Sequence, residues 1–128
     1  MRIFKHAWLC LLLSGASCTY DKANGDPCPL PTTVSFSKDI QPVFEQYCNT
    51  TGCHSGPSPG GNFNLETAVA YAQLYKPGSG YIDTLTPRYS ILYAQLNSTS
   101  NPMPPDGKLE RCTQELILKW IEQKAPNN

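Results

Sequence analysis

The sequence CNTTGCHSG, residues 48–56, places a histidine directly after the second of two cysteines that have four residues between them. The chain has 128 residues, six cysteines and two histidines, so this stretch gathers a large share of its potential metal ligands. Gly52 and the polar residues before it suit a tight bulge, because glycine adopts backbone conformations that other residues avoid. The stretch therefore predicts a cofactor site, a metal site or a disulfide loop.

Simple metal and redox sites fit this stretch poorly. A structural zinc site needs a fourth ligand, and a blue-copper site needs a second histidine. His6 lies in the leader described below, which leaves His54 alone. A thioredoxin-like site would require C-x-x-C in a βαβ context. A disulfide between Cys48 and Cys53 stays open as an alternative, and it would make His54 an ordinary surface residue.

Covalent haem attachment uses all three residues of the stretch. In the usual motif, C-x-x-C-H, both cysteines bond to the haem and the histidine binds the iron. A sixth iron ligand is also available, because Met103 is the only methionine besides Met1 and lies in the proline-rich run NPMPP. Histidine and methionine together ligate the iron of cytochromes c and raise its potential. An exposed loop methionine is the alternative for Met103.

The N-terminus has the layout of an exported protein. Residues 1–17 combine a basic start, a short apolar run and small residues, which is typical of a signal peptide. The next residue, Cys18, makes the segment resemble the lipobox of bacterial lipoproteins, although Gly15 stands where that family has an apolar residue. We therefore expect a lipidated Cys18 and anchoring in the bacterial cell envelope, facing the periplasm or the cell exterior. Ordinary cleavage nearby, with Cys18 free, is the alternative.

A second pair of cysteines remains after these assignments. Residues 18–33 are rich in proline and glycine and predict a flexible tether, followed by a single domain over residues 34–126. Cys10 lies in the leader, so Cys28 and Cys112 are left over. An even pair in an exported chain predicts a disulfide, with two free thiols as the alternative.

The apolar pattern of residues 34–126 predicts helices and no strand. Pro42 fits only near a helix start, so Asp39 is the expected cap of the first helix. Thr86 is the expected cap of the third helix, with Pro87 at its first position. Two loops, residues 55–63 and 97–108, are long for a compact domain and indicate a bound ligand or a function. The predicted fold class is all-α, with helices over residues 38–48, 65–75, 87–96 and 110–124.

These motifs as a set resemble the small monohaem cytochrome c domains of exported bacterial proteins. The resemblance implies a cytochrome c-like fold of about four short helices and long loops around one covalently bound haem c. Two features depart from the family: the four-residue spacing of the cysteines, and Lys124 where a glycine is common. The stretches that carry the resemblance are VSFSKDIQPVFEQYC, CHSG, NPMPPDGKL and LILKWIEQKAP.

The resemblance also assigns roles to individual residues. It implies attachment of one haem at Cys48 and Cys53 and iron ligation by His54 and Met103. It implies that Trp120 lies near the haem pocket. Because the terminal helices of such domains cross, it further implies that the two leftover cysteines can meet.

The function implied by the resemblance is one-electron transfer rather than catalysis, because six-coordinate iron has no open position. The expected partners are redox proteins and, through the lipid anchor, a membrane; no small-molecule substrate is expected. Ten basic and ten acidic residues give no basic patch, so nucleic acid is not an expected partner. The alternatives are a haem-free, disulfide-stapled interaction module and an accessory haem protein with a structural or sensory role. A haem protein that handles small ligands or peroxide is a further alternative, if Met103 does not bind iron.

Overall fold

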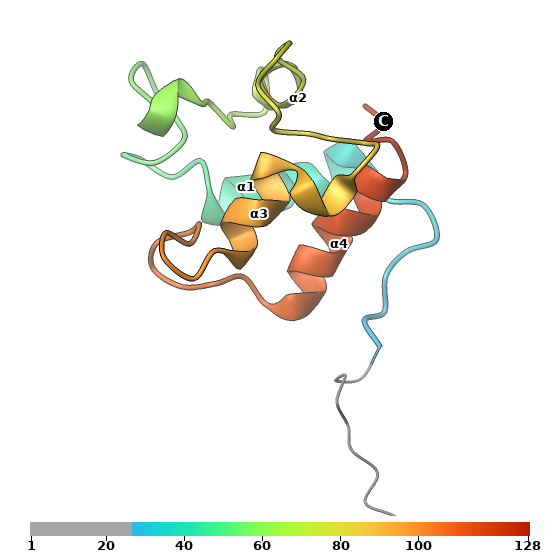
Figure 1. Cartoon of the computed structure of the whole chain (residues 1–128). Helices are drawn as coiled ribbons and strands as arrows, with labels where there is room; N and C mark the ends of the chain where they lie inside the picture. The colour runs from blue at the N-terminus through green and yellow to red at the C-terminus, as the bar shows by residue number, and fades with distance from the viewer. Residues whose placement is uncertain (1–26) are drawn as a thin grey trace, which may run out of the picture.

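The computed structural model describes residues 27–128 and shows a set of short helices joined by long loops (Figure 1). No strand occurs within these residues, so the predicted all-α class is confirmed. The leader and Cys18 lie outside the described residues. The α-helices are α1 (Gln41–Tyr47), α2 (Ala70–Leu74), α3 (Ile91–Asn97) and α4 (Arg111–Glu122). The shorter helical segments are the π-helix η1 (Phe36–Ile40) and the 3₁₀-helices η2 (Gly60–Asn62) and η3 (Pro87–Tyr89).

The first helical segment starts earlier than predicted. Ser35 is the N-cap, and its hydroxyl accepts a hydrogen bond of 3.3 Å from the backbone of Lys38. Asp39 is therefore not the cap, but its carboxylate accepts a 2.7 Å bond from the Ser35 backbone N–H, so the two residues cap the segment reciprocally. η1 leads directly into α1, whose first turn contains Pro42, the position that tolerates proline.

The second predicted helix is shorter than expected, and the third is divided in two. α2 covers only half of residues 65–75, because Asn64 accepts a 2.7 Å bond from the Glu66 backbone and starts a turn there. The predicted helix over 87–96 is divided into η3 and α3 at Ser90, whose backbone is extended. The buried Ser90 hydroxyl accepts a 2.8 Å bond from the Asp83 N–H, which fixes this break. Thr86 donates its hydroxyl to Asp83 and makes no side-chain cap.

The core lies where α4 packs against η1, η3 and α3. Trp120 is fully buried, with its ring 5.4 Å from that of Phe36. Burying an aromatic side chain of this size contributes about 1.5–3 kcal/mol. The other buried apolar residues come from η1, the four α-helices and the loops beside them: Val34, Ile40, Phe44, Phe63, Leu65, Ala70, Leu74, Tyr93, Leu96, Leu109, Ile117, Leu118, Ile121 and Ala125.

The end of α4 is closed by backbone hydrogen bonds. The N–H of Lys124 bonds the carbonyl of Ile121 at 3.0 Å, and the N–H of Ala125 bonds that of Trp120 at 2.9 Å. This pair of bonds is the Schellman motif, which requires a left-handed residue after the cap. Lys124 takes that position, with φ +71°. It therefore adopts the conformation for which glycine is usually chosen.

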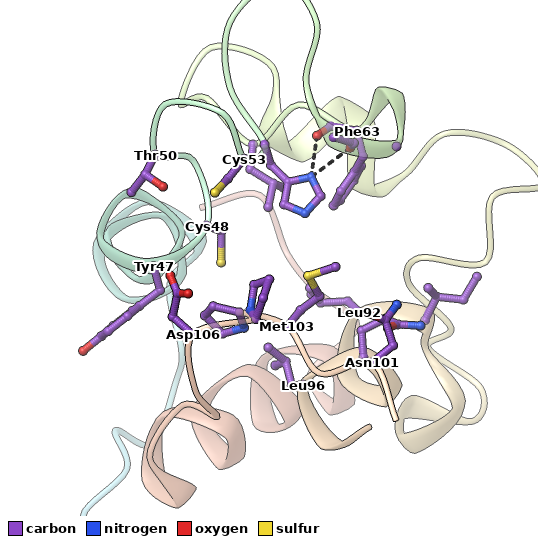
Figure 2. Close-up of a pocket in the computed structure, with 18 of the residues that line it drawn as sticks. Tyr47, Cys48, Thr50, Cys53, Phe63, Leu92, Leu96, Asn101, Met103 and Asp106 are labelled. Atoms are coloured by element: carbon purple, nitrogen blue, oxygen red, sulfur yellow. Dashed lines mark hydrogen bonds between the residues drawn. The ribbon is translucent and has the colours of Figure 1, made fainter. Parts of the chain in front are cut away.

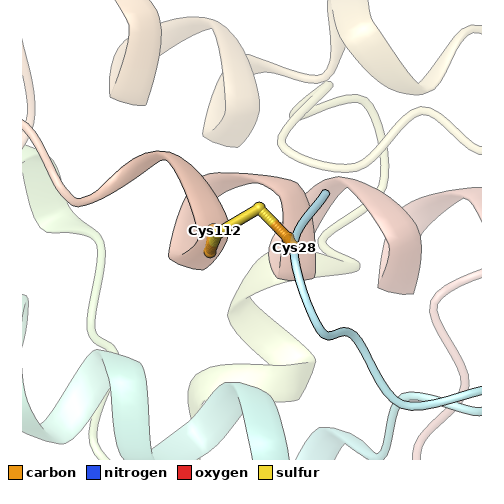
Figure 3. Close-up of a disulfide and its surroundings, with 2 residues drawn as sticks. All are labelled: Cys28 and Cys112. Atoms are coloured by element: carbon orange, nitrogen blue, oxygen red, sulfur yellow. A yellow bond between two sulfur atoms is a disulfide. The ribbon is translucent and has the colours of Figure 1, made fainter. Parts of the chain in front are cut away.

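The N-terminal segment is fastened along α4. Figure 3 shows Cys28 bonded to Cys112 in the first turn of this helix; the two Cα atoms are 5.3 Å apart. Further along, the Gln123 side chain donates to the Thr32 carbonyl at 2.7 Å and accepts from the Val34 N–H at 2.9 Å. The described end of the expected tether is thus held against the domain from residue 28 onward.

Candidate cofactor site

A cavity of about 600 Å³ opens between the loop that starts at Cys48, helix α3 and the loop that carries Met103. Its size lies within the range of cofactor sites, roughly 300–1,000 Å³. All four residues expected to hold a haem line it: Cys48, Cys53, His54 and Met103. Figure 2 shows the two cysteines on one side and Met103 on the facing loop.

The four residues between the cysteines form a compact turn. The Cys53 N–H bonds the Thr50 carbonyl at 2.9 Å, and Gly52 occupies the third position of this turn with φ +84°. Positive φ at that position is what a type II β-turn requires, and glycine supplies it without strain. The His54 N–H then bonds the Cys48 carbonyl at 3.0 Å and closes the loop. The two additional residues of the motif are therefore accommodated without separating His54 from the first cysteine.

Cys48 and Cys53 are free thiols in the structure, so the alternative of a disulfide between them is not what the fold adopts. Burial, together with the smaller effect of a charge on nearby Cys53, raises the pKa of the Cys48 thiol to about 11. At neutral pH the Cys48 thiol therefore keeps its proton, because loss of the proton would put an anion in a poorly solvated position.

The imidazole of His54 is oriented by backbone carbonyls. Its Nδ1 lies 2.9 Å from the Phe63 oxygen and 3.1 Å from the Gly60 oxygen (Figure 2). A carbonyl can only accept, so Nδ1 carries the hydrogen and donates it. The opposite nitrogen, Nε2, then holds a lone pair, which is the form of histidine that binds a metal.

Met103 is held by α3. Its backbone N–H bonds the Gln95 carbonyl at 3.1 Å, and the Met103–Pro104 peptide bond is cis. The side chain of Gln95 also lines the cavity, and its buried Oε1 has no hydrogen-bond partner within the described part of the chain. A buried polar atom without a partner is uncommon and often marks a place where a bound group completes the structure.

Several lining residues were not assigned from the sequence. Tyr81 stacks on Phe63 with ring centroids 4.1 Å apart, and both line the cavity. Tyr47, at the end of α1, is 40% exposed and also lines the cavity. The sequence could have indicated Gln95, because it follows Leu92 by three residues and therefore lies on the same helix face. A polar residue on an apolar face indicates a special environment.

Trp120, which the resemblance places near the haem pocket, is fully buried. It does not line the cavity; it lies in the core against Phe36, and its indole N–H donates to the Pro126 carbonyl at 3.0 Å. Its partners are thus the first helical segment and the chain beyond α4. Its helix, α4, contacts η1, η3 and α3, and the expected proximity of Trp120 to a haem stays a prediction.

The other expected pair of cysteines lies away from the cavity. Cys28 and Cys112 form the disulfide at the start of α4, which is the pairing expected from the cysteine count. Among residues 27–128, no three His, Cys, Asp or Glu side chains cluster in a way that could hold a metal ion. In the same range, no helix has the length and apolar character needed to cross a bilayer.

No protein-family model matches the chain, and comparisons with curated proteins and with solved structures return no match. The function must therefore be argued from the geometry of the site itself.

Proposed function

We propose that the chain is a monohaem c-type cytochrome domain that carries single electrons. Cys48 and Cys53 would bond the haem, with His54 and Met103 as the axial ligands of its iron. The observation that carries this proposal is the convergence of these four side chains, from two distant segments, on one cavity of about 600 Å³. A cytochrome c-like arrangement of the helices belongs to the same proposal.

The chemistry of the lining residues fits this cofactor. Both thiols are unpaired, and His54 holds the tautomer that leaves Nε2 available. Met103 offers a soft, neutral thioether from a loop fixed to α3. The buried Gln95 Oε1, which has no hydrogen-bond partner among the described residues, is an acceptor that a bound cofactor could satisfy. Bound haem supplies a one-electron couple, whose potential depends on the axial ligands and on exclusion of water.

The protein contributes orientation and shielding. The Phe63 and Gly60 carbonyls hold the imidazole ring, while the apolar side chains of Phe63, Leu65 and Leu96 exclude water from one wall of the cavity. With one histidine and one methionine assigned to the iron, no coordination position is left for a substrate. We therefore propose a redox carrier with protein partners rather than an enzyme.

An exported location supports the same function. The Cys28–Cys112 disulfide is typical of oxidising compartments, and the leader-like residues 1–17 precede a cysteine suited to lipidation. We propose that the domain works outside the bacterial cytoplasm, anchored at Cys18. A structural or sensory haem subunit would share this location and differ only in its partners.

Covalent attachment is the direct test. The protein is produced in bacteria that mature c-type cytochromes, and its intact mass is measured under denaturing conditions. We expect the polypeptide mass plus one haem, and a c-type pyridine haemochrome spectrum. The Cys48→Ala/Cys53→Ala variant should lose the added mass, whereas the matched Cys28→Ser/Cys112→Ser variant should keep it. An unmodified wild-type mass, from cells that mature other cytochromes of this spacing, would favour the haem-free interaction module.

A further inference from the structure

Side chains from α1, and from Asn49 two residues beyond it, bind the segment that follows the cavity loop. Gln41, Glu45 and Asn49 are spaced four residues apart, which aligns side chains on one side of a helix. The Gln41 amide donates to the Leu65 carbonyl at 3.3 Å, and the Asn49 amide donates to the same oxygen at 3.2 Å. Glu45 accepts a 2.6 Å bond from the Thr67 hydroxyl. The three residues together hold positions 65–67.

The segment held in this way is the one that orients the histidine. The Leu65 N–H bonds the His54 carbonyl at 2.8 Å, and two residues earlier the Phe63 carbonyl accepts the hydrogen of His54 Nδ1 at 2.9 Å. The backbone of residues 63–65 is thus fastened to His54 on one side and to α1 on the other. A shift of Leu65 would move the Phe63 carbonyl relative to the imidazole ring.

The burial of the Gln41 side chain calls for a reason. Gln41 is only 3% exposed, and its Oε1 has no partner among the described residues, although its amide nitrogen is bonded. Burying a polar group that is only partly satisfied is unfavourable. Asn49 is the first of the four residues between the cysteines, so this contact comes from the cavity loop itself.

We infer that Gln41 and Asn49 are positioning residues for His54. They fix residues 63–65 so that the Phe63 carbonyl keeps the imidazole in the tautomer with hydrogen on Nδ1. The value of this arrangement to the protein rests on the proposed haem ligation. The tautomer of His54, however, can be measured without haem. A histidine that donates a firm hydrogen bond from one nitrogen is a stronger ligand through the other.

The first experiment reads the tautomer without haem. In full-length apoprotein labelled with [¹⁵N]histidine, a His6→Gln background leaves His54 as the only imidazole. We expect the wild-type spectrum to show hydrogen on Nδ1. Gln41→Met combined with Asn49→Ala should introduce the Nε2–H tautomer. Each single substitution should cause less than half of the tautomer shift seen in the double variant, because either amide can donate to the Leu65 carbonyl by itself.

Thr67→Val is the matched control, since it removes the bonds of the Thr67 hydroxyl to Glu45 and to the Gln41 amide but leaves both donors to the Leu65 carbonyl. A tautomer shift in the double variant but not in Thr67→Val supports the inference. An unchanged tautomer in a folded double variant, or an equal shift in the control, overturns it. Should the double variant not fold, Asn49→Asp puts an acceptor beside the Leu65 carbonyl and must give the shift by itself; an unchanged tautomer there also overturns the inference.

The second experiment uses the haem-loaded protein. Weakening the Nδ1 hydrogen bond makes the imidazole a poorer donor to iron, so the midpoint potential should rise in the double variant and stay at the wild-type value in Thr67→Val. An unchanged potential overturns the inference while the haem remains attached. Absence of haem from the wild type instead contradicts the proposed function and leaves the tautomer experiment to decide the positioning role.

Discussion

At the scale of single residues, the site depends on the protonation of two neighbouring side chains. Cys48 is kept as a neutral thiol by burial, and His54 is kept in one tautomer by two carbonyls. Both effects come mainly from the surrounding backbone and packing, with a smaller effect of Cys53 on Cys48. Each has a consequence that can be measured on the protein in solution.

The Cys48 thiol should make the stability of the apoprotein depend on alkaline pH. Its pKa is raised from 9.0 to about 11, so the folded state keeps a proton that the unfolded state loses. The stabilisation is fully present below pH 9 and is lost as pH rises through 11. Urea unfolding measured across this pH range should show the decline.

The control is Cys48→Ala, which should flatten the part of the decline that begins at pH 9. Tyr75, whose pKa is raised to about 12 mainly by burial, contributes at higher pH in both proteins and so cancels in the comparison. Parallel curves for the two proteins would show that the thiol is solvated after all. Haem-loaded protein should lack the effect, because its thiol is consumed.

Met103→Ala tests the sixth ligand. A thioether favours ferrous over ferric iron, so its loss should lower the potential. The vacated position should also let the haem-loaded variant bind carbon monoxide more readily than the wild type. Pro102→Ala, which keeps the sulfur, is the control. Unchanged potential and ligand binding in Met103→Ala would make Met103 an ordinary loop residue.

At the scale of elements, the structure depends on short segments with well-defined ends. α1, α2 and α3 have seven, five and seven residues, too few to be stable alone. Side chains from elsewhere in sequence fix two of the starts: the Phe36 N–H, at the start of η1, donates to the Asn128 side chain at 2.9 Å, and Ser90, just before α3, bonds Asp83. α4, with twelve residues, is the longest and ends in the left-handed Lys124.

Lys124→Gly should therefore stabilise the protein. A non-glycine residue in the left-handed region costs about 1–2 kcal/mol, and glycine avoids this at a smaller cost in chain entropy. The exposed bond from the lysine ammonium to the Thr84 carbonyl is lost, which offsets part of the gain. We expect a net increase of up to about 1 kcal/mol in the free energy of unfolding, measured by denaturant titration.

The same substitution within α4 provides the control. Lys119→Gly lies in the last turn of the helix, where glycine costs about 1 kcal/mol relative to a good helix former. The two variants should thus shift the unfolding midpoint in opposite directions. A destabilised Lys124→Gly would mean that the lysine side chain contributes more than its backbone conformation costs.

The helices could be predicted from the sequence, but their breaks could not. Apolar spacing identified α1 and α4 because their buried faces follow the helical period. Ser90 interrupts the third helix through a bond to Asp83, seven residues earlier, and no local propensity encodes that contact. The site followed the same rule. The four expected cofactor-binding residues were visible as motifs, whereas the positions of Tyr81 and Gln95 in the lining depend on how distant segments meet.

At the scale of the whole molecule, one covalent bond joins the two ends of the domain. Cys28 and Cys112 are 84 residues apart in sequence, and the bond closes a loop that contains the cavity. Closing a long loop restricts the unfolded chain more than closing a short one. The disulfide and Gln123 together keep the N-terminal segment along α4.

Cys28→Ser combined with Cys112→Ser should lower the free energy of unfolding by about 2–5 kcal/mol. Denaturant unfolding, with both proteins free of haem, measures the difference. Treating the wild type with a reductant should reproduce the effect, and the double variant should not respond to the reductant. Equal unfolding midpoints for the wild type and the double variant would mean that the other contacts of the N-terminal segment stabilise the protein without the disulfide.

Anchoring of the whole molecule is tested at Cys18. Cys18→Ser should move the protein from the membrane fraction to the soluble fraction, because stable anchoring requires more than one acyl chain and this cysteine is the expected site of all of them. Cys10→Ser, in the expected leader, is the matched control and should leave the protein with the membrane. A soluble wild type that starts at another residue would contradict the lipoprotein assignment.

The disulfide would also limit how far the proposed redox site can lie from a membrane. From Cys18 to Cys28 the chain has ten residues, and these span at most about 35 Å when fully extended. Without the bond, the free segment would run to Thr32, which Gln123 holds, and would reach about 50 Å. If Cys18 is lipidated, the protein with its disulfide intact would meet only partners whose redox centres lie close to the bilayer surface. Reduction of the bond would extend this reach by about two fifths.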